Sequence, residues 1–552
     1  MSLHPEHGGS EHGGAEGGRP VRLFGDGAVV AEVASSHEAQ RLAAALAGRA
    51  MAGVDDVVVG YRSVTVVADP DVADMASVAA AMASGAPSVA DRGGRGGAGA
   101  GAVEIPVAFD GPDLGEVSAL AGMTPDQVVA ALTAGPLAVA LLGFLPGFAY
   151  LDGLPPALAA VARRATPRAR VPAGSVGVAG GFAGIYPQAS PGGWQLVGRS
   201  AVTLFDPAAP PYATLRPGDE VRLRAVTDVG EPPGGATRGA LTARSSRRVE
   251  VDSAGVLSLV QDLGRLGVAG LGVPRAGAAD PVGLRAANRL VGNHDGAAVI
   301  EVSAAGPRLR FGCHAHVAVV GGVEVSVDGR AVTSDAVVPL APGQVLTVGT
   351  VHDGLRCYLA VDGGVDVPVV LGSRSSDVLT GIGIGPLRAG DTLGLGAPRR
   401  PRGRLVWPGA RGCPRRLRVM PGPDPFPPGA LELLTSAPWT VTAESDRMGV
   451  RLSGARPLHA PGVVSSRAMV TGAVQVPPDG QPVVLVCDHA TVGGYPVVAT
   501  VVLADHGVLG RCAPGETVTF SAVDASEAGR ARGEAGRALA RAVRGWYPVR
   551  AD

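Results

Sequence analysis

Glycine and proline interrupt this chain so often that they limit the elements it can form. The 552 residues include 83 glycines and 46 prolines, whereas aromatic residues make up only 4%. Both residues terminate helices and strands, so we expect many short strands joined by tight turns rather than long helices. A chain of this length exceeds one hydrophobic core and predicts three or four domains.

The charged residues exclude several classes of function. The formal net charge is −1 and the two signs are interspersed, so we expect no nucleic-acid-binding or membrane-binding surface. All 48 basic residues are arginine, and the sequence contains no lysine. A Walker-A phosphate loop, a Schiff-base enzyme and a biotin carrier each need a lysine, so none of the three is expected within this sequence.

The cysteines and the apolar runs indicate a cytoplasmic protein. The longest apolar stretch, Leu137 to Leu151, is interrupted by glycine and proline and is too short to span a bilayer. The first 19 residues lack the basic and apolar regions of a signal peptide and predict a disordered tail. Five cysteines without a CxxC pair favour a reducing compartment over a disulfide framework: Cys313, Cys357, Cys413, Cys487 and Cys512.

One short run carries metal-binding residue types. In Cys313-His314-Ala315-His316, a strand would place His314 and His316 on one face and Cys313 on the other. No third ligand lies nearby in the sequence, so we expect no metal site.

Shifts in composition divide the chain into domains. The glycine-rich run "DRGGRGGAGAGA" and the run "TDVGEPPGGATRGALTARSS" are typical of linkers. Helices are expected after the N-cap Thr124, over Pro281 to Leu290 and over Ala525 to Arg544. The predicted division is a tail (1–19), a small α/β domain (20–90), a linker (91–102), a β-rich domain (103–226), a second linker (227–246), two further β-rich domains (247–400 and 417–524) and a helical tail (525–552).

Two segments far apart in the chain repeat one pattern. "RPGDEVRLRAV" begins at Arg216, and "APGETVTFSAV" begins at Ala513. In each, a Pro-Gly turn precedes alternating apolar and polar residues, which predicts a turn leading into a half-buried strand. The repeat indicates that the two β-rich blocks it closes are related, barrel-like domains.

Three polar clusters are candidates for a functional site. Gln261-Asp262-Leu263-Gly264-Arg265 follows a predicted strand, and Glu444 to Gly449 places acids beside an arginine. Thr471 to Pro496 combines Asp and Gly turns around an apolar strand. Gly lets backbone N–H groups approach a ligand, and Asp or Gln accepts hydrogen bonds from it. Each cluster could equally serve only turns, because Gly and Asp are common there.

Longer motifs resemble a known pair of families. "FLPGFAYL" from Phe144, "VPAGSV" from Val171, "GIYP" from Gly184 and "SPGGW" from Ser190 resemble allophanate hydrolase subunit 1, the family of KipI and of the 5-oxoprolinase B subunit. "VQDLGR" from Val260, "LGSRS" from Leu371, "SDRMG" from Ser445 and "QVPPDGQP" from Gln475 resemble allophanate hydrolase subunit 2, the family of KipA and of the 5-oxoprolinase C subunit. The resemblance spans about residues 20–525 and indicates a B/C fusion.

The resemblance implies a fold and an activity. The fold would be mixed α+β and β-rich, with cyclophilin-like β-barrel domains in both halves and a small N-terminal α/β domain. The activity would be ATP-dependent opening of the lactam of 5-oxoproline to L-glutamate, with Mg²⁺ and with the separate 5-oxoprolinase A subunit for a partner. A homo-oligomer is left open.

Two alternatives follow from the same resemblance. One is the carboxyltransferase component of a biotin-dependent urea or amide carboxylase, with biotin on another chain. The other is a KipI/KipA-like regulator of a histidine kinase, which a fusion disfavours because it would tether an inhibitor to its antagonist.

The resemblance also selects site residues. A planar amide or urea suits a rim of glycine N–H groups with Asp acceptors and Arg donors. Arginines would neutralise a phosphate or carboxylate, and aspartates would hold Mg²⁺ or orient water. The catalytic candidates are Asp262, Arg265, Asp446, Arg447, Asp479 and Asp488; the substrate-binding candidates are Gly174, Ser175, Tyr186, Trp194, Arg199, Gln261, Gln475, Gly493, Gly494 and Tyr495.

The chain departs from the family pattern at a few positions. Thr133 stands where a histidine is common, and His489 follows Asp488 where an arginine is usual. Val492 and Val497 replace the second threonine and the lysine of a T-T-G-G-Y-P-K motif. These positions bear on which substrate is used.

Overall fold

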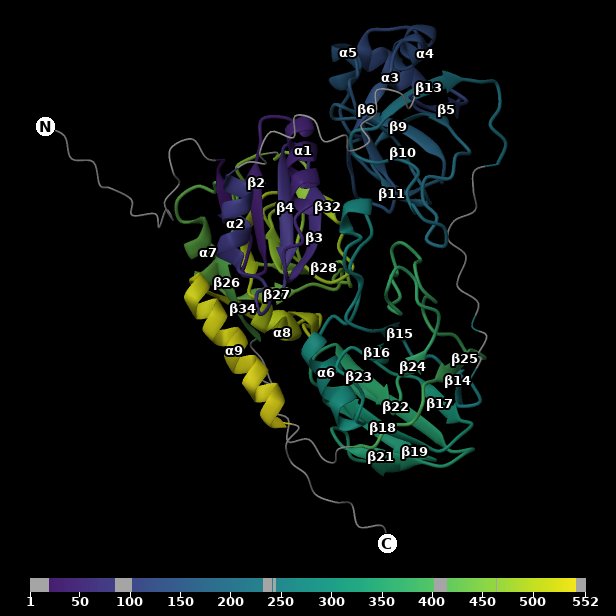
Figure 1. Cartoon of the computed structure of the whole chain (residues 1–552), viewed down its shortest axis with the longest axis vertical. Helices are drawn as coiled ribbons and strands as arrows, with labels where there is room; N and C mark the ends of the chain where they lie inside the picture. The colour runs from purple at the N-terminus through teal and green to yellow at the C-terminus, as the bar shows by residue number, and fades with distance from the viewer. Residues whose placement is uncertain are drawn as a thin grey trace, which may run out of the picture.

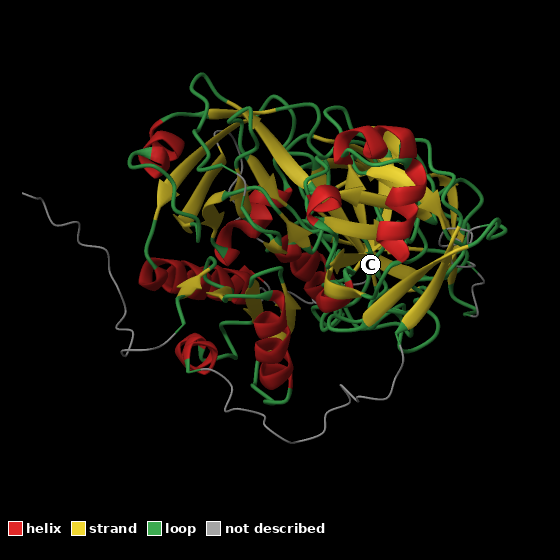
Figure 2. Ribbon diagram, turned by 90° about the horizontal axis from the view of Figure 1, so that it is seen from above, coloured by secondary structure: helices red, strands yellow, loops and turns green. Residues whose placement is uncertain are grey.

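The computed structural model describes residues 19–84, 102–231, 241, 245–401, 415–462 and 464–542 (Figure 1). Most of the predicted tail, most of both linkers, Cys413 and residues 543–552 of the predicted helical tail lie outside the described residues. The fold is β-rich and mixed α+β, as predicted, and strands occur in every part of the molecule (Figure 2). No helix in the described ranges is both long and apolar enough to cross a membrane.

The N-terminal domain is a four-stranded sheet with two helices. Strands β2 and β3 run in the same direction on either side of β4, so β2-α1-β3 is a βαβ unit with a strand inserted. A turn at residues 60–62 reverses the chain between β3 and β4. The elements are β1 (Val21–Leu23), β2 (Ala28–Glu32), α1 (Ser36–Ala47), β3 (Val54–Val59), β4 (Ser63–Ala68) and α2 (Met75–Ala83).

The next domain is a seven-stranded sheet that curves into a barrel-like body. Its strand order is β12-β9-β10-β7-β6-β13-β5, and a bridge between Ala108 and Arg199 joins its two ends. Thr124 caps α4 as predicted, with a reciprocal capping box to Gln127. The elements are β5 (Val103–Val107), α3 (Leu114–Ala121), α4 (Pro125–Thr133), β6 (Leu137–Leu142), β7 (Ala149–Asp152), α5 (Pro156–Ala159), β8 (Arg168–Val171), β9 (Ser175–Ala179), β10 (Phe182–Ile185), β11 (Ser190–Gly192), β12 (Gln195–Arg199) and β13 (Glu220–Ala225).

The third domain is a two-sheet sandwich covered by one helix. Its core lies between a seven-stranded sheet, β20-β19-β22-β17-β14-β25-β24, and a five-stranded sheet, β15-β16-β23-β18-β21. Helix α6 (Pro281–Leu290), which begins and ends as predicted, packs on the outer face of the smaller sheet. The strands are β14 (Arg248–Ser253), β15 (Leu257–Gln261), β16 (Val299–Ser303), β17 (Arg308–Phe311), β18 (Ala315–Val320), β19 (Val323–Val327), β20 (Arg330–Val332), β21 (Val337–Leu340), β22 (Val345–Val351), β23 (Arg356–Val361), β24 (Val365–Asp366) and β25 (Thr392–Leu395); the 3-10 helix η1 (Ala269–Leu271) precedes α6.

The fourth domain is a closed barrel, with the order β26-β33-β30-β31-β28-β27-β34. Each copy of the repeated pattern forms the last strand of its barrel in chain order, and that strand pairs in parallel with the first: β13 with β5, and β34 with β26. The elements are β26 (Arg415–Pro421), α7 (Ala430–Ser436), β27 (Trp439–Val441), β28 (Gly449–Ser453), β29 (Arg467–Ala468), β30 (Ala473–Gln475), β31 (Val483–Leu485), β32 (Val492–Gly493), β33 (Val497–Val501), η2 (Leu503–Asp505), α8 (His506–Gly510), β34 (Thr517–Ala522) and α9 (Ala525–Ala542).

The domains are joined by apolar contacts rather than only by the chain. The N-terminal sheet packs on the closed barrel through Phe24, Ala28 and Val30 against Met469 and its neighbours (Figure 1). Helix α9 then runs along the closed barrel and reaches the N-terminal domain, where Arg532 pairs with Asp26 at 2.9 Å. The closed barrel therefore lies at the centre of the assembly.

Candidate functional site

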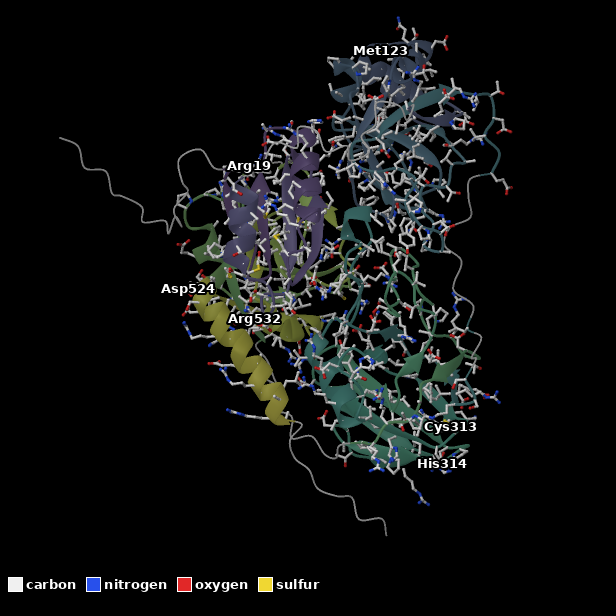
Figure 3. All side chains as sticks on the ribbon, viewed as in Figure 1. Arg19, Met123, Cys313, His314, Asp524 and Arg532 are labelled. Atoms are coloured by element: carbon white, nitrogen blue, oxygen red, sulfur yellow. The ribbon has the colours of Figure 1, made fainter. Side chains whose placement is uncertain are left out.

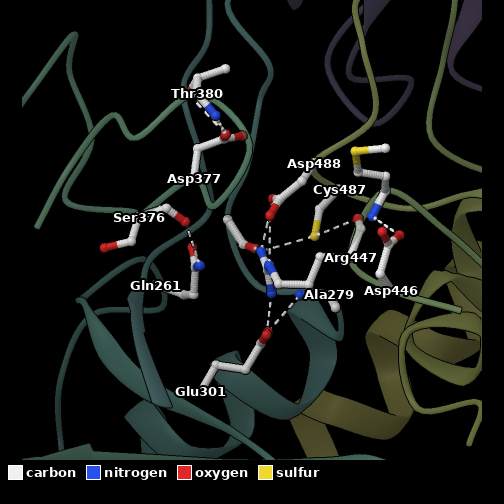
Figure 4. Close-up of polar contacts among 12 residues, drawn as sticks. Gln261, Ala279, Glu301, Ser376, Asp377, Thr380, Asp446, Arg447, Cys487 and Asp488 are labelled. Carbon is white, nitrogen blue, oxygen red and sulfur yellow. Dashed lines mark hydrogen bonds and ion pairs between the residues drawn. The ribbon is translucent and has the colours of Figure 1, made fainter. Parts of the chain in front are cut away.

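A buried ionic network lies where the closed barrel meets the sandwich (Figure 4). Arg447, in the turn between β27 and β28, binds Asp488 through Nε–Oδ2 at 2.7 Å and Nη2–Oδ1 at 3.0 Å. Its Nη1 donates to the carboxylate of Glu301 on β16. All three side chains are at most 5% exposed. A guanidinium shared by two carboxylates satisfies charges that would otherwise be costly to bury.

Glu301 was not predicted from the sequence. Burial alone would raise its pKa, but Arg447 and Arg356 outweigh burial and hold the pKa below its ordinary value. Its second oxygen accepts hydrogen bonds from the N–H of Ala279 at 2.8 Å and the hydroxyl of Tyr358 at 2.8 Å. The signal in the sequence was a single acid flanked by the apolar residues Val299, Ile300 and Val302.

Asp262 joins two of the sequence motifs. Its Oδ1 accepts hydrogen bonds from the hydroxyls of Ser373 and Ser375, each at 2.6 Å, and its Oδ2 accepts one from the N–H of Arg374 at 2.7 Å. The N–H of Gly264 donates to the same carboxylate at 2.9 Å. With these donors, Asp262 holds the "LGSRS" loop against "VQDLGR" rather than offering a free carboxylate.

Three buried side chains beside this loop keep an unused polar atom. Oε1 of Gln261, Nη1 of Arg265 and Oδ2 of Asp377 make no hydrogen bond to the described residues. Burial, and then the charge of Asp488, raise the pKa of Asp377 to about 6, while Arg265 opposes the shift. One donor and two acceptors therefore remain for a planar amide or a water molecule.

Two predicted catalytic aspartates lie outside the network. Asp446 is exposed and accepts hydrogen bonds from the N–H groups of Met448 and Gly449 at 2.8 and 3.0 Å. Asp479 is also exposed and accepts one from the N–H of Gln481 at 3.1 Å. Both are turn residues, and Asp446 shapes the turn that presents Arg447.

The candidates in the first barrel-like domain do not line an open cleft. They belong to an aromatic cluster, called the aromatic joint below, where this domain packs against the N-terminal domain and the closed barrel. Tyr186 and Trp194 are buried and pack edge-to-face on Phe148, with ring centroids 5.2 and 5.4 Å apart. Burial raises the pKa of the Tyr186 phenol to about 12. Ser175 is buried on β9 next to Gly174, whose positive φ of +77° and N–H bond to Tyr186 hold the turn before that strand. The expected cleft wall is therefore an aromatic core.

Arg199 lies apart from both groups. It is substantially exposed and pairs with Asp110 at 2.8 Å and Asp228 at 3.2 Å. The structure does not bring it to the network, so its contacts are those of a surface ion pair.

The remaining candidates lie on or beside the ribbon β29–β32. Gln475 is buried and its Nε2 donates to the Met469 sulfur at 3.2 Å, and a Cβ on Gly493 would lie 3.0 Å from that nitrogen. Gly494 is half-buried and follows β32, whereas Tyr495 is 49% exposed. These residues do not join the ionic network.

The departures from the family pattern are accommodated by packing. Val492 packs against Gly143, where a Cβ would collide with it, and Val497 is buried in the contact with the N-terminal domain. The hydroxyl of Thr133 donates to its own helix at Val129, 2.8 Å away. His489 is buried, which lowers its pKa.

A cavity of about 520 Å³ lies beside the network. Leu263 and Gly264 of "VQDLGR" line it, as do Cys487 and His489, the two neighbours of Asp488. The opposite wall comes from the N-terminal domain and includes Asp55, Asp56 and Asp69; helix α9 closes one side. The sequence motifs thus border the cavity, although the predicted side chains point into the network behind it.

The acids of the cavity were not predicted: Asp55 and Asp56 lie at the start of β3, and Asp69 directly follows β4. Burial raises the pKa of Asp56 to about 6, against the lowering effect of hydrogen bonds from Ala269 and Gly267. Burial also raises the pKa of Asp55, which lies 3.6 Å from Arg275. Both carboxylates feel the positive charge of Arg275, which comes from the half of the chain that contains the sandwich.

The described residues do not identify a nucleotide or metal site. No group of three His, Cys, Asp or Glu side chains in this part of the chain could hold a metal ion. Cys313 and His314 lie at the far end of the sandwich, away from the cavity (Figure 3). We assign no ATP or Mg²⁺ ligands to these residues, and no step below passes through either.

Comparison with known proteins identifies the two halves. A family model described as carboxyltransferase domain, subdomain C and D, matches residues 20–215, and one described as subdomain A and B matches residues 271–522. The 5-oxoprolinase C subunit of Escherichia coli (strain K12) is 35% identical over 297 residues, which cover 51% of this chain and 94% of that protein. This chain belongs to the family of the 5-oxoprolinase C subunit, and its first half is similar to the B subunit of the same enzyme.

Other relatives agree with this assignment. The 5-oxoprolinase B subunit of Escherichia coli O157:H7 is 50% identical over 124 residues, 22% of this chain and 56% of that protein. The crystal structure of TTHA0988 matches with a TM-score of 0.81 and 35% identity, over 91% of this chain and all of that one. The urea amidolyase of Lachancea kluyveri is 32% identical over 305 residues, which are 49% of this chain and 17% of that protein.

Proposed function

We propose that this chain is the combined B and C component of an ATP-dependent 5-oxoprolinase, working with a separate A subunit to open the lactam of 5-oxoproline to L-glutamate. One observation carries the proposal: the cavity is lined from both halves. Asp55 and Asp56 come from the half that resembles the B subunit, whereas Arg285 and His489 come from the half that resembles the C subunit. Separate B and C subunits would complete such a cavity only when assembled. Fusion in one chain keeps both walls of the cavity in the same molecule.

The residues around the cavity suit binding and orientation of an amide. An amide carbonyl is a poor electrophile because resonance places negative charge on its oxygen, so activation by ATP is needed. In this proposal the activating step belongs to the assembly with the A subunit. This chain would supply fixed donors and acceptors: Arg285, Asp55 and Asp69 line the cavity, and Arg265 and Asp377 keep unused polar atoms in the network behind it.

Reconstitution tests the proposal directly. The full chain is mixed with the A subunit, ATP, Mg²⁺ and 5-oxoproline, and glutamate is assayed. We expect glutamate only when all components are present, and matched mixtures lacking one component at a time are the controls. If the complete mixture forms a stable complex and yields no glutamate, the proposal is wrong.

A second candidate function has its own support. The matching family models are carboxyltransferase domains, and urea amidolyase shares this part of the chain. In that case the chain would transfer a carboxyl group from biotin on another chain to urea or an amide. Carboxylation of urea in the presence of a biotinylated carrier, without glutamate formation from 5-oxoproline, would support this function instead.

A further inference from the structure

Three arginines line the cavity, and one of them has no partner. Arg532 pairs with Asp26 at 2.9 Å and Asp71 at 2.7 Å, and Arg275 lies 3.6 Å from Asp55. The side chain of Arg285, on the second turn of α6, makes no hydrogen bond or ion pair with any residue that the structure describes. It is half-buried, so its guanidinium is partly removed from water without compensation.

The surroundings of Arg285 make this lack of a partner significant. Burial lowers its pKa, and the positive charge of Arg275 lowers it further. Two acids attract it: Asp295 is already held by Arg289 through two contacts of 2.6 Å, and Asp69 lies in the cavity wall without forming an ion pair with Arg285. A desolvated cation without a partner is costly, so an anion entering the cavity would gain a charge-assisted hydrogen bond without displacing an existing one.

The shape and chemistry of the cavity define the anion. A volume of about 520 Å³ suits a small molecule. The planar fork of a guanidinium matches a carboxylate. Across the cavity, the N-terminal domain presents the carboxylates of Asp55 and Asp69, which accept hydrogen bonds from N–H groups. A lactam that carries a carboxylate next to its N–H offers both partners, whereas urea carries no anionic group.

We propose that Arg285 anchors the carboxylate of the substrate and makes the cavity selective for a carboxylate-bearing lactam over an uncharged amide. This inference rests on the proposed function in taking the cavity as the substrate site. It assigns a specificity residue outside all the family motifs named above.

Calorimetric titration of the full chain, alone and with the A subunit, tests the inference. The ligands are 5-oxoproline, 2-pyrrolidone, which is the same lactam without the carboxylate, and glutarate, a carboxylate without the lactam. We expect the wild type to bind 5-oxoproline about ten- to hundredfold more tightly than 2-pyrrolidone, as for a charge-assisted hydrogen bond. Arg285→Gln should remove this preference by weakening 5-oxoproline alone, and Arg285→Lys should keep part of it.

Arg537→Gln is the matched control, because it removes the same charge at an exposed position of α9, a helix that closes one side of the cavity, and does not itself line the cavity. Its preference should equal that of the wild type. The thermal midpoint of Arg285→Gln should be no lower than that of the wild type, because no contact is lost.

The outcomes separate the inference from the proposed function. If 5-oxoproline binds Arg285→Gln as tightly as the wild type, Arg285 is not the anchor, and the proposed function is untouched. If glutarate binds through Arg285 but 5-oxoproline does not bind, the anchor is supported and the proposed function is contradicted. If neither carboxylate binds the wild type, whether or not the A subunit is present, the inference is wrong.

Discussion

The two barrels of this chain have the same strand order, but equivalent loops carry aromatic side chains in one barrel and charged side chains in the other. Counted from the first strand, the order is β5-β13-β6-β7-β10-β9-β12 in one and β26-β34-β27-β28-β31-β30-β33 in the other. Each barrel also carries a separate two-stranded ribbon, β8–β11 or β29–β32. The chain thus contains one architecture twice.

The loops show the difference. Between the second and third strands, the first barrel carries Phe148 and the closed barrel carries Arg447; after the fifth strand they carry Tyr186 and Asp488. The first pair belongs to an aromatic joint, and the second pair to an ionic network beside the cavity. One copy of the fold therefore holds domains together, while the other carries charge to the candidate site.

The ionic side of this comparison should be the more fragile. Arg447→Met leaves Asp488 buried without its cation and Glu301 with only Arg356, 3.6 Å away, and we expect a loss of about 3–5 kcal/mol at pH 7. The pKa of Glu301 is held below its ordinary value, so its contribution is present at neutral pH and is lost as pH falls through that lowered pKa. The loss caused by the variant should therefore shrink in acid.

Hydrogen exchange of the β31 amides measures this loss locally, which suits a protein of several domains. Arg451→Met, at an exposed position on β28, is the control. Equal protection in the two variants would show that the network does not stabilise the barrel.

The second prediction concerns the cavity wall opposite the network. Asp56 has a pKa of about 6 against an ordinary 3.8, so its ionisation costs the folded state stability as pH rises between these values. Asp56→Asn removes that cost and should stabilise the protein above pH 6 by up to about 3 kcal/mol, from about two pKa units at about 1.4 kcal/mol each. Below pH 4 the gain should vanish.

Urea midpoints of wild type and Asp56→Asn between pH 4 and pH 8 check this prediction, with Asp479→Asn as an exposed control. A difference that does not change with pH would mean that Asp56 ionises at its ordinary value.

The aromatic joint should respond less, and without pH dependence. Phe148→Leu keeps an apolar side chain but loses the edge-to-face contacts with Tyr150, Tyr186 and Trp194, and we expect a cost of about 1.5 kcal/mol. Exchange of the β10 amides at pH 5 and pH 8 should show the same cost. A cost that changes with pH would show that ionisable groups also stabilise the first barrel, and would contradict the difference drawn between the two barrels.

The smallest effect should come from Arg199. Its two ion pairs are exposed, so Arg199→Ala should leave the Kd for 5-oxoproline within twofold of the wild type. A tenfold rise in Kd would contradict this prediction. It would indicate that Arg199 contacts the substrate and that the first barrel contributes a residue to the substrate site.

Local signals in the sequence predicted local structure well. The cap at Thr124, helix α6 and the closing strands β13 and β34 depend on neighbouring residues, and each formed as expected. Asp446 and Asp479 show the limit of such signals, because an aspartate in a turn looks the same whether it binds a ligand or only N–H groups.

Features that depend on distant parts of the chain could not be predicted. Glu301 is matched by Arg447, 146 residues later, and Arg285 lacks a partner while Arg289, four residues further along the helix, holds Asp295. Tyr186 and Trp194 carry a family motif, but the docking of the domains decides that they pack inside a joint. Pairing across domains is a property of the fold, not of any short segment.

The position of α9 has a consequence for how the protein is made. Arg532 and Leu539 line the same cavity as Asp26 and Asp55, so its wall joins residues synthesised early with residues synthesised more than 470 positions later. A ribosome-bound chain that has released only its first domains holds an open half of the cavity. The cavity is therefore complete only after translation has passed α9.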